Sequence, residues 1–212
     1  FMKKKIIIVD YGLGNIRSVQ NSIQKAMNLY GISGEVQRSS NYKSLSEASH
    51  IILPGQGAFE SCIRGLNDLS GMIEELQSQV IVKKKPILGI CVGMQLFSDI
   101  GFENGQHKGL GWISGSVIRM PSNKKILPHM GWNEINCLNE NPILKKLGKE
   151  HFYFVHSYYF EVKNPNNIIA ESNYGISFPV AVAKENILGV QFHPEKSADA
   201  GIKLLSNFLL LE

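Results

Sequence analysis

At residues 86–95 the chain reads Pro86-Ile87-Leu88-Gly89-Ile90-Cys91-Val92-Gly93-Met94-Gln95, an apolar segment that leads into a cysteine with a glycine two residues before and after it. The segment from Pro86 to Ile90 is typical of a buried strand, and a helix is expected to begin at Met94. A side chain on a tight turn between strand and helix projects clear of the sheet when its neighbours are small. We therefore predict an α/β fold in which Cys91 lies at the carboxyl end of a strand.

A later segment carries residues that could activate this cysteine. His193-Pro194-Glu195 directly follows the apolar run from Ile187 to Phe192, which is expected to be a strand. Alone, the histidine could mark a turn and the cysteine could be a small buried hydrophobe. Functional sites of open α/β sheets, however, gather at the carboxyl ends of strands. We interpret Cys91 as the nucleophile, His193 as its base and Glu195 as the orienting carboxylate of a cysteine hydrolase that acts on an amide.

The turn after another expected strand offers a binding site for an oxyanion. The strand from Ile51 runs into Pro54-Gly55-Gln56-Gly57. Glycines permit positive φ and a flipped peptide, so backbone N–H groups of Gly55, Gln56 and Gly57 can turn toward a developing negative charge. An ordinary βα turn would have the same composition. Beside Cys91 we predict an oxyanion loop, with the Val92 amide as the second donor.

Composition narrows the class of protein. The chain has 212 residues, of which 43% are hydrophobic, so a single domain over residues 1–212 with a full core is expected. No apolar run approaches the ~20 residues that span a bilayer, which argues against a membrane anchor or a signal peptide. Three cysteines without metal-like spacing predict a cytoplasmic protein with no metal and no disulfide framework, and we expect Cys62 and Cys137 to be small buried hydrophobes. The net charge of +4 is too modest to favour nucleic-acid binding.

The apolar pattern changes character near Gly109. Before it, expected strands alternate with expected helices, which predicts parallel βαβ units. The strands lie at 4–9, 34–38, 49–53 and 86–90, and the helices at 15–29, 59–66 and 72–83. After it we expect short, mostly antiparallel strands at 112–120, 132–136, 153–162, 168–172, 180–184 and 187–192, then a helix at 200–211 that covers the sheet. The fold class is an open mixed, largely parallel sheet flanked by helices, with additional antiparallel strands in the second half.

Three segments together resemble the signature of the class I (triad) glutamine amidotransferases, which have a flavodoxin-like fold. They are Pro54 to Gly57, Gly89 to Gln95 and His193 to Glu195. Four further segments are similar to those of the glutaminase subunits of imidazole glycerol phosphate synthases, enzymes of histidine biosynthesis: Asp10 to Asn15, Pro128 to Asn133, Tyr153 to Tyr158 and Gln191 to Ser197. The three triad segments identify only the chemistry. The four further segments are specific to a narrower group of these enzymes, and the resemblance extends over essentially the whole chain.

The resemblance implies a substrate, a partner and further site residues. The substrate is L-glutamine, no cofactor is needed, and ammonia passes to a (β/α)8-barrel cyclase subunit in a heterodimer, which forms imidazole glycerol phosphate and an aminoimidazole carboxamide ribonucleotide. Gln95 and Glu103 match positions that hold glutamine. The positions that match the interface around the ammonia entrance are Asn15, His129, Met130, Trp132, Tyr153 and Lys196.

Each of these assignments has a plainer alternative. Glu103 and Lys196 could be solvated surface charges, Trp132 and Tyr153 could be core aromatics, and Asn15 could simply cap a helix. One position departs from the resemblance, because the turn commonly has Val where Gln56 stands here. The loop needs only its backbone amide, so we expect activity to survive, but a Gln side chain could hydrogen-bond locally and alter how the loop flips.

Other functions remain open on this sequence. Within the family, the chain could serve anthranilate, aminodeoxychorismate or pyridoxal phosphate synthesis, but the segment from Pro128 to Asn133 argues against these. A paralogue that amidates a surface sugar is harder to distinguish by sequence from the glutaminase subunits of imidazole glycerol phosphate synthases. A regulatory subunit that has kept the fold without catalysis is another alternative, which the presence of Cys91, His193 and Glu195 disfavours.

Overall fold

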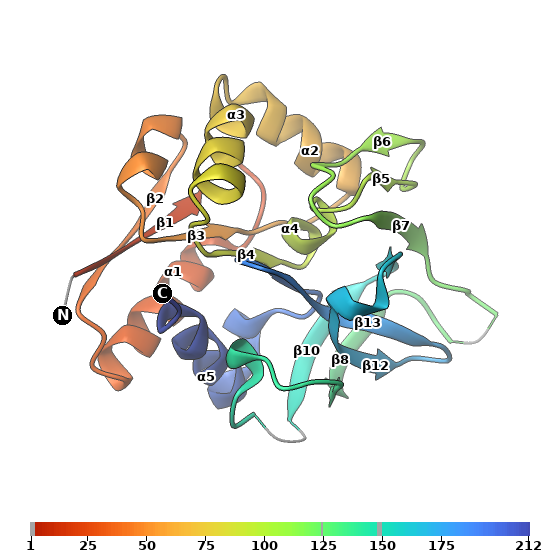
Figure 1. The fold of residues 1–212 in the computed structure, drawn as a ribbon. Coiled ribbons are helices and arrows are strands. Elements are labelled where there is room, and N and C mark those ends of the chain that lie inside the picture. The colour runs from red at the N-terminus through yellow and green to blue at the C-terminus, as the bar shows by residue number, and fades with distance from the viewer. Residues whose placement is uncertain (1–2, 124, 148–149) are drawn as a thin grey trace.

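An eight-stranded mixed sheet runs through the middle of the molecule (Figure 1). The protein is described here by a computed structural model that covers residues 3–123, 125–147 and 150–212. The strand order is β2-β1-β3-β4-β14-β13-β12-β9. The strands are β1 Lys4–Val9, β2 Gly34–Ser39, β3 His50–Leu53, β4 Ile87–Ile90, β9 Asn136–Cys137, β12 Ile168–Asn173, β13 Ser177–Lys184 and β14 Ile187–Val190.

The sheet changes from parallel to antiparallel beyond β14. Strands β2, β1, β3, β4 and β14 are mutually parallel, whereas β13, β12 and β9 continue the sheet in antiparallel fashion. Apart from the polar, largely exposed edge strand β2, the parallel strands are mostly apolar and buried, as in Ile6 to Val9 and Ile51 to Leu53. Such continuous apolar runs are typical of strands covered by helices on both faces. This arrangement confirms the predicted fold class.

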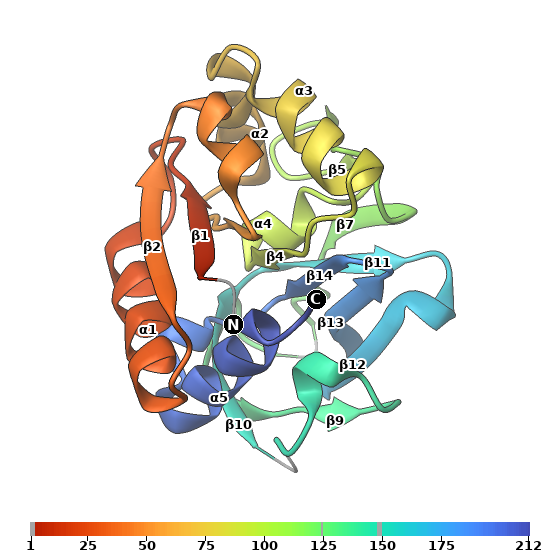
Figure 2. The same ribbon diagram turned by 60° about the vertical axis from the view of Figure 1, so that its left-hand side comes forward.

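Helices cover both faces of the parallel part, and Figures 1 and 2 agree on their placement. Helices α1 Ile16–Leu29 and α5 Ala198–Leu209 pack together on one face. The other face carries α2 Phe59–Asp68, α3 Met72–Leu76, the π-helical turn Gln77–Val82 and the short α4 Val92–Gln95. In α1 the buried apolar residues recur at helical spacing, so the helix presents one apolar stripe to the sheet.

Two small sheets complete the second half of the chain. One pairs β8 His129–Glu134 with β10 His151–His156, and the other has the order β11 Tyr158–Val162, β7 Gly115–Arg119, β5 Ile100–Gly101 and β6 His107–Lys108. Four short 3-10 turns connect the elements: Tyr42–Glu47, Pro142–Leu144, Pro165–Asn167 and Pro194–Lys196. No helix of the described ranges is long and apolar enough to cross a membrane.

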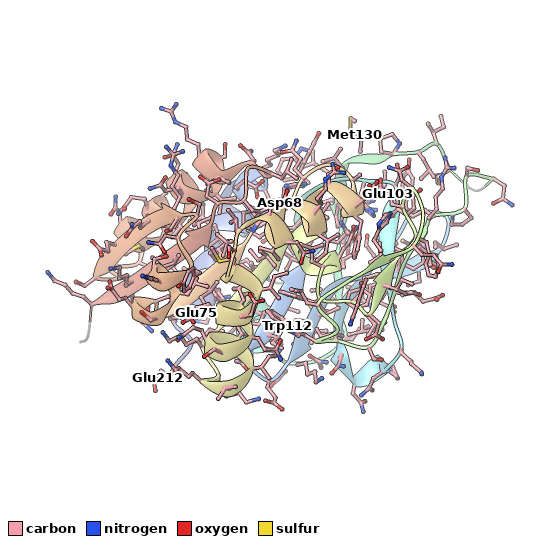
Figure 3. The ribbon with its side chains drawn as sticks, turned by 90° about the horizontal axis from the view of Figure 1, so that it is seen from above. Asp68, Glu75, Glu103, Trp112, Met130 and Glu212 are labelled. Carbon is pink, nitrogen blue, oxygen red and sulfur yellow. The ribbon has the colours of Figure 1, made fainter. Side chains whose placement is uncertain are left out.

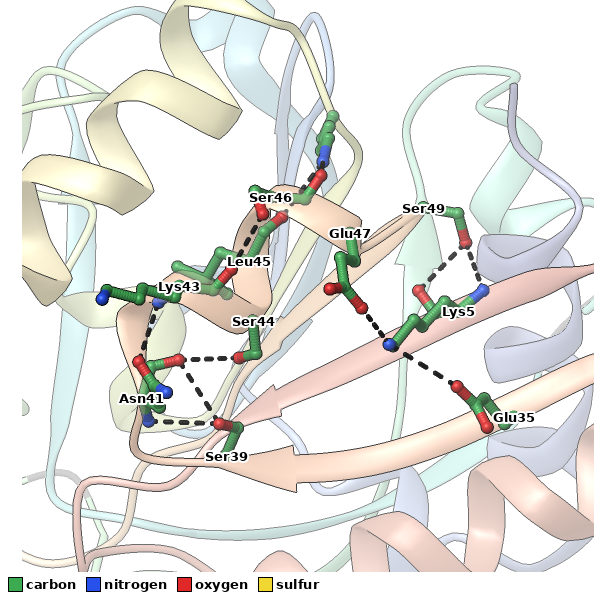
Figure 4. Close-up of polar contacts among 11 residues, drawn as sticks. Lys5, Glu35, Ser39, Asn41, Lys43, Ser44, Leu45, Ser46, Glu47 and Ser49 are labelled. Carbon is green, nitrogen blue, oxygen red and sulfur yellow. Dashed lines mark hydrogen bonds and ion pairs between the residues drawn. The ribbon is translucent and has the colours of Figure 1, made fainter.

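The 3-10 turn between β2 and β3 is tied down by polar contacts, which Figure 4 shows in detail. Lys5 of β1 forms ion pairs with Glu47 and, at 3.7 Å, with Glu35. The Lys85 Nζ donates to the carbonyls of Leu45 and Ser46 at 3.0 and 2.7 Å, which joins this turn to the chain just before β4. The exposed pairs add little free energy, but the bonds to backbone carbonyls satisfy groups that a longer helix would have paired.

Several predicted boundaries are wrong in ways that have a physical reason. The expected strand at 153–162 is two strands, because the chain leaves one sheet at Ser157 and enters another. The helix after Cys91 begins at Val92 rather than Met94, since Cys91 itself makes the turn. The expected strand at 112–120 begins at Gly115, because the Trp112 ring packs on Phe97 instead. The helix predicted at 72–83 changes to π-helical geometry at Gln77.

Candidate active site

Cys91 makes a sharp turn between β4 and α4. Its φ of 53° and ψ of −113° are unusual for a residue other than glycine, and its N–H donates to Val190 O at 2.8 Å. Neighbouring glycines make the turn possible. A Cβ on Gly93 would lie 1.9 Å from Leu53 O, and one on Gly89 would lie 2.7 Å from Met94 N. The turn is therefore clamped between backbone atoms, and the cysteine is held in a strained conformation typical of a nucleophile.

His193 and Glu195 form a buried pair next to this cysteine. The His193 Nδ1 lies 2.8 Å from Glu195 Oε1, and only 3% and 1% of their side chains are exposed. Burial alone lowers the pKa of His193, but the charge of Cys91, its hydrogen bond and the Glu195 carboxylate together raise it to about 10. The raised pKa favours the protonated imidazole at neutral pH. Because Glu195 occupies Nδ1, the other ring nitrogen is left for chemistry.

The loop Pro54–Gly57 packs against the cysteine turn from the other side. A Cβ on Gly55 would lie 2.5 Å from Gly93 N, so the two backbones are in direct contact. Gly57 has a φ of 92°, in the region that glycine favours, and both Gln56 and Gly57 are exposed. The N–H of Val92 has no acceptor among the described residues. Backbone donors of the loop and of Val92 thus border the same space beside the sulfur.

Two buried side chains hold this loop from beneath. The Tyr11 hydroxyl donates to Pro54 O, and Cys62 Sγ donates to Gln56 O at 3.4 Å. Burial raises the pKa of both Tyr11 and Cys62, so each remains a protonated donor. The prediction that Cys62 is only a small hydrophobe is therefore wrong, although its burial is confirmed. Cys137 is half-buried rather than buried.

A cavity of about 310 Å³ opens beside the sulfur. Its walls bring together residues from distant parts of the chain: Gln56, Gly57, Cys91, Val92, Gln95, Glu103, Pro128, Val155, His156, Ser157, Tyr158 and His193. Gln95 donates both of its N–H groups, to Tyr158 O and Gln191 Oε1, and its Oε1 has no partner in the described part of the chain. Glu103 accepts from Phe59 N at 2.8 Å through Oε2. An acceptor amide oxygen and a carboxylate thus face one space, which suits a ligand that carries an ammonium group.

Comparison with known proteins agrees with this geometry. The family model "Glutamine amidotransferase class-I" matches residues 7–211. The chain is 44% identical over 209 residues to the imidazole glycerol phosphate synthase subunit HisH of Pelagibacter ubique (strain HTCC1062), covering 97% of this chain and 99% of that protein. It is 42% identical over 211 residues to the HisH subunit of Brucella suis biovar 1 (strain 1330), covering 97% and 98%.

The chain belongs to the class I glutamine amidotransferases, within the HisH family. A crystal structure of a glutamine amidotransferase superposes with a TM-score of 0.69 at 19% identity, covering 92% of this chain and 93% of that one. At this identity the likeness concerns the fold alone. The enzyme class of the chain is that of a glutamine amidotransferase, and the resemblance noted in the sequence is confirmed.

One face of the amidotransferase carries an exposed aromatic pair with a lysine. Trp132 and Tyr153 lie opposite each other on β8 and β10, with ring centroids 6.1 Å apart, and Trp132 is 54% exposed. Lys196 Nζ lies 5.8 Å from the Tyr153 ring, and Met130 is 61% exposed. In Figure 3, Met130 and Glu103 lie toward the same edge of the molecule. These side chains are not core residues, and they belong to the face that also carries the active-site cavity.

Two residues expected at this face behave differently. His129 is buried, with its ring stacked between Phe154 and Tyr174, so its side chain does not reach the surface. Asn15 occupies the N-cap position of α1, but its side chain makes no capping hydrogen bond. Burial lowers the pKa of His129 to about 4, so the ring is neutral and bonds to His156 at 2.9 Å.

Sequence reasoning missed three residues that contact the site. Tyr11 and Cys62 hold the loop, and the Gln191 amide reaches the Cys91 sulfur. Gln191 lies in the segment from Gln191 to Ser197 that resembles the family, but a local sequence pattern does not determine the direction of a side-chain amide. As for metals, no group of three or more His, Cys, Asp or Glu side chains suited to a metal ion occurs in the described ranges.

Proposed function

We propose that this chain is the glutaminase subunit of an imidazole glycerol phosphate synthase, with Cys91, His193 and Glu195 as its catalytic triad. One observation carries the proposal. A cysteine held at a φ of 53° shares a cavity with an imidazole whose Nδ1 is paired with a buried carboxylate at 2.8 Å. This is the arrangement expected of an activated nucleophile, its base and the group that orients the base.

The proposed reaction runs through a thioester. The Cys91 thiolate attacks the side-chain carbonyl carbon of L-glutamine, and the carbonyl oxygen becomes an oxyanion that the Val92 N–H and a loop N–H stabilise. His193 then gives a proton to the departing nitrogen, the carbon–nitrogen bond breaks, and ammonia leaves. Water that loses a proton to His193 hydrolyses the thioester, which releases glutamate and restores the thiolate.

Binding of glutamine in the cavity is supported by the donor and acceptor set of its walls. Gln95 has a free Oε1, and Glu103 has a second carboxylate oxygen besides the one bonded to Phe59 N. Both can accept from the α-ammonium of glutamine, which would place the side-chain amide toward the sulfur. The loop residues Gly55, Gln56 and Gly57 close the same space with backbone groups. A loop that changes its peptide orientation would supply or withdraw one oxyanion donor.

The partner is proposed from the family and from the exposed face. The HisH relatives are named as subunits of imidazole glycerol phosphate synthase, and we propose that a (β/α)8-barrel cyclase binds this chain and receives its ammonia. Protein interfaces are enriched in aromatic and methionine side chains, which Met130, Trp132 and Tyr153 supply here, and Lys196 adds a positive charge beside Tyr153. Asn15 lies at the start of α1, and His129 is the first residue of β8 with its ring buried. A cytoplasmic location, in keeping with three free cysteines, is part of the proposal.

Glutamate release tests the proposal in three steps. The chain is assayed alone, with a cyclase partner, and with partner and phosphoribulosyl acceptor. We expect strong stimulation only in the last step and complete loss with Cys91→Ala. If Cys91→Ala kept glutamine-dependent activity in the complex, the nucleophile assignment would fall. If the complex used glutamine but ignored this acceptor, the chemistry would stand and the histidine-pathway assignment would fall.

The interface can be tested separately from the chemistry. Trp132→Ala removes a large exposed ring that makes no core contact, so we expect weaker partner binding by about tenfold or more with unchanged stability. Isothermal titration with the cyclase measures the affinity. Leu138→Ala is a matched control, because Leu138 is also exposed but lies away from the cavity face. Equal effects of both substitutions would contradict the proposed interface.

A further inference from the structure

Gln191 places its amide against the sulfur of Cys91 from the interior of the protein. Its Nε2 lies 3.6 Å from Cys91 Sγ, and the side chain is fully buried. Strand pairing dictates this neighbourhood. Strands β14 and β4 are parallel with Val190 opposite Ile90, so the next residues on each chain, Gln191 and Cys91, lie side by side. Gln191 is not part of the cavity wall, so it reaches the sulfur but not the substrate space.

A chain of hydrogen bonds decides which end of the Gln191 amide faces the sulfur. It starts at Tyr158 O, a backbone carbonyl that can only accept, so the Gln95 atom 3.1 Å away must be the nitrogen. The same Gln95 nitrogen donates to Gln191 at 2.9 Å, which makes the receiving atom Oε1. The remaining end of the Gln191 amide is therefore its nitrogen, and an N–H donor faces Cys91 Sγ.

A donor at this place favours the charged form of the sulfur. Hydrogen bonds to an ionised acceptor are stronger than those between neutral groups, so an N–H that reaches sulfur stabilises the thiolate more than the thiol or the thioester. The same bond forms again when the thioester is hydrolysed and the thiolate leaves. His193 supplies charge on one side of the sulfur, and Gln191 supplies a fixed, uncharged donor on the other.

We propose that Gln191 is a fourth residue of the reaction centre, whose amide N–H holds Cys91 as a thiolate and receives it as the leaving group. This rests on the proposed role of Cys91 as nucleophile. Because Gln191 lies outside the cavity, its N–H acts on the sulfur and does not contact glutamine. Gln95 is then a positioning residue as well, since its N–H fixes the direction of the Gln191 amide.

Alkylation of Cys91 in the full chain tests this without glutamine or partner. Gln191→Met keeps an unbranched side chain of similar length and removes the N–H. We expect the pH midpoint of iodoacetamide alkylation of Cys91 to move about one pH unit upward, and the reaction below that midpoint to be about tenfold slower. Mass spectrometry of the Cys91 peptide separates it from Cys62 and Cys137. In the complex, kcat should fall by a similar factor; KM for glutamine is not the readout, because Gln191→Met also removes the acceptor of the Gln95 N–H.

Gln79→Met is the matched control, because Gln79 is an equally buried glutamine that bonds to Glu75 far from the cavity. It should leave the alkylation profile of Cys91 unchanged. A folded Gln191→Met protein with the parental profile would overturn the proposal. If that variant does not fold, nuclear magnetic resonance of the parental chain decides. The Gln191 side-chain amide signal must shift when Cys91 is alkylated, and a signal that stays in place refutes the contact. Neither outcome depends on whether Cys91→Ala abolishes glutamine hydrolysis.

Discussion

The two sides of the cavity are built in opposite ways. The turn at Cys91 is confined by backbone on every side, and three glycines of the surrounding strands and turn, Gly89, Gly93 and Gly189, leave no room for a single added carbon. The loop at Pro54–Gly57 is held at its carbonyls by Tyr11 and Cys62, while Gln56 and Gly57 are exposed. The proposed nucleophile is thus fixed by packing, whereas the outer loop residues Gln56 and Gly57 are exposed and the loop's carbonyls are held by two replaceable hydrogen bonds.

This difference separates two requirements of the reaction. A nucleophile must stay in one geometry, because a misplacement of about 1 Å can lower the rate a hundredfold. In the proposed reaction, an oxyanion donor that can turn away would let the enzyme stay inactive until its proposed partner is bound. Substitutions on the rigid side should therefore affect folding and activity together, whereas substitutions on the loop side should affect activity more than stability.

Gly93→Ala should have the largest effect. The new Cβ would lie 1.9 Å from Leu53 O, so either the turn or β3 must move. We expect a loss of about 3 kcal/mol or more in the free energy of unfolding and at least a hundredfold loss of glutaminase activity in the complex. Urea denaturation and glutamate release measure the two effects.

Gly57→Ala is the matched substitution on the loop side. Nothing lies within 4 Å of its added Cβ, and only the φ of 92° is unfavourable. The free energy of unfolding should fall by about 1 kcal/mol. If Gly57→Ala destabilised the protein as much as Gly93→Ala, the distinction between a rigid and an adjustable side would not hold.

Low pH should lower the free energy of unfolding through three buried histidines. Burial lowers the pKa of His50, His129 and His156 to about 4, 4 and 3, from 6.5 in the unfolded chain. Between these values the unfolded state binds more protons than the folded state, so the contribution of these three rings to stability is complete above about pH 6.5 and falls as the pH is lowered. We expect the three rings together to lose about 3 kcal/mol between pH 6.5 and about pH 5.5, measured by urea denaturation.

His50→Leu serves as the control for this pH dependence. It removes one of the three titrating rings at a site far from the cavity, where His50 packs edge-on against Phe208. The slope of stability against pH should fall by roughly a third, since His50 lies apart from the bonded pair His129–His156. A slope that does not change would mean that the buried histidines are not the groups that take up protons on unfolding.

The sequence predicts the parts of this site that are local in the chain. Cys91 with its glycines, and His193 with Glu195, each lie in a short segment whose residue types are dictated by their chemistry. The contacts of Tyr11, Cys62 and Gln191 depend on strand order and on distances across the sheet, which no local pattern contains. The burial of His129 was missed for the same reason, because the rings of Phe154 and Tyr174 that enclose it come from other segments.

Tyr11→Phe tests the stronger of the two bonds that hold the loop. It removes only the hydroxyl that donates to Pro54 O in a buried site, so we expect a loss of about 1 to 2 kcal/mol in the free energy of unfolding. Activity in the complex should fall further than this loss of stability explains. Cys62→Ala should have a smaller effect in the same direction, and Cys137→Ala is the control because it makes no contact with the loop. Equal activity of all three variants would show that these bonds do not position the loop.

Gln56→Ala should have the smallest effect, and it tests whether the loop works through its backbone alone. The Gln56 side chain is exposed and makes no hydrogen bond within the described residues, so its removal should change the free energy of unfolding by less than about 0.5 kcal/mol. The backbone carbonyl that Cys62 holds remains, so glutaminase activity in the complex should stay within about twofold. The ratio of activity with and without partner is the informative measurement. A large change in that ratio at unchanged stability would mean that the Gln56 side chain, and not only the peptide backbone, sets how easily the loop turns.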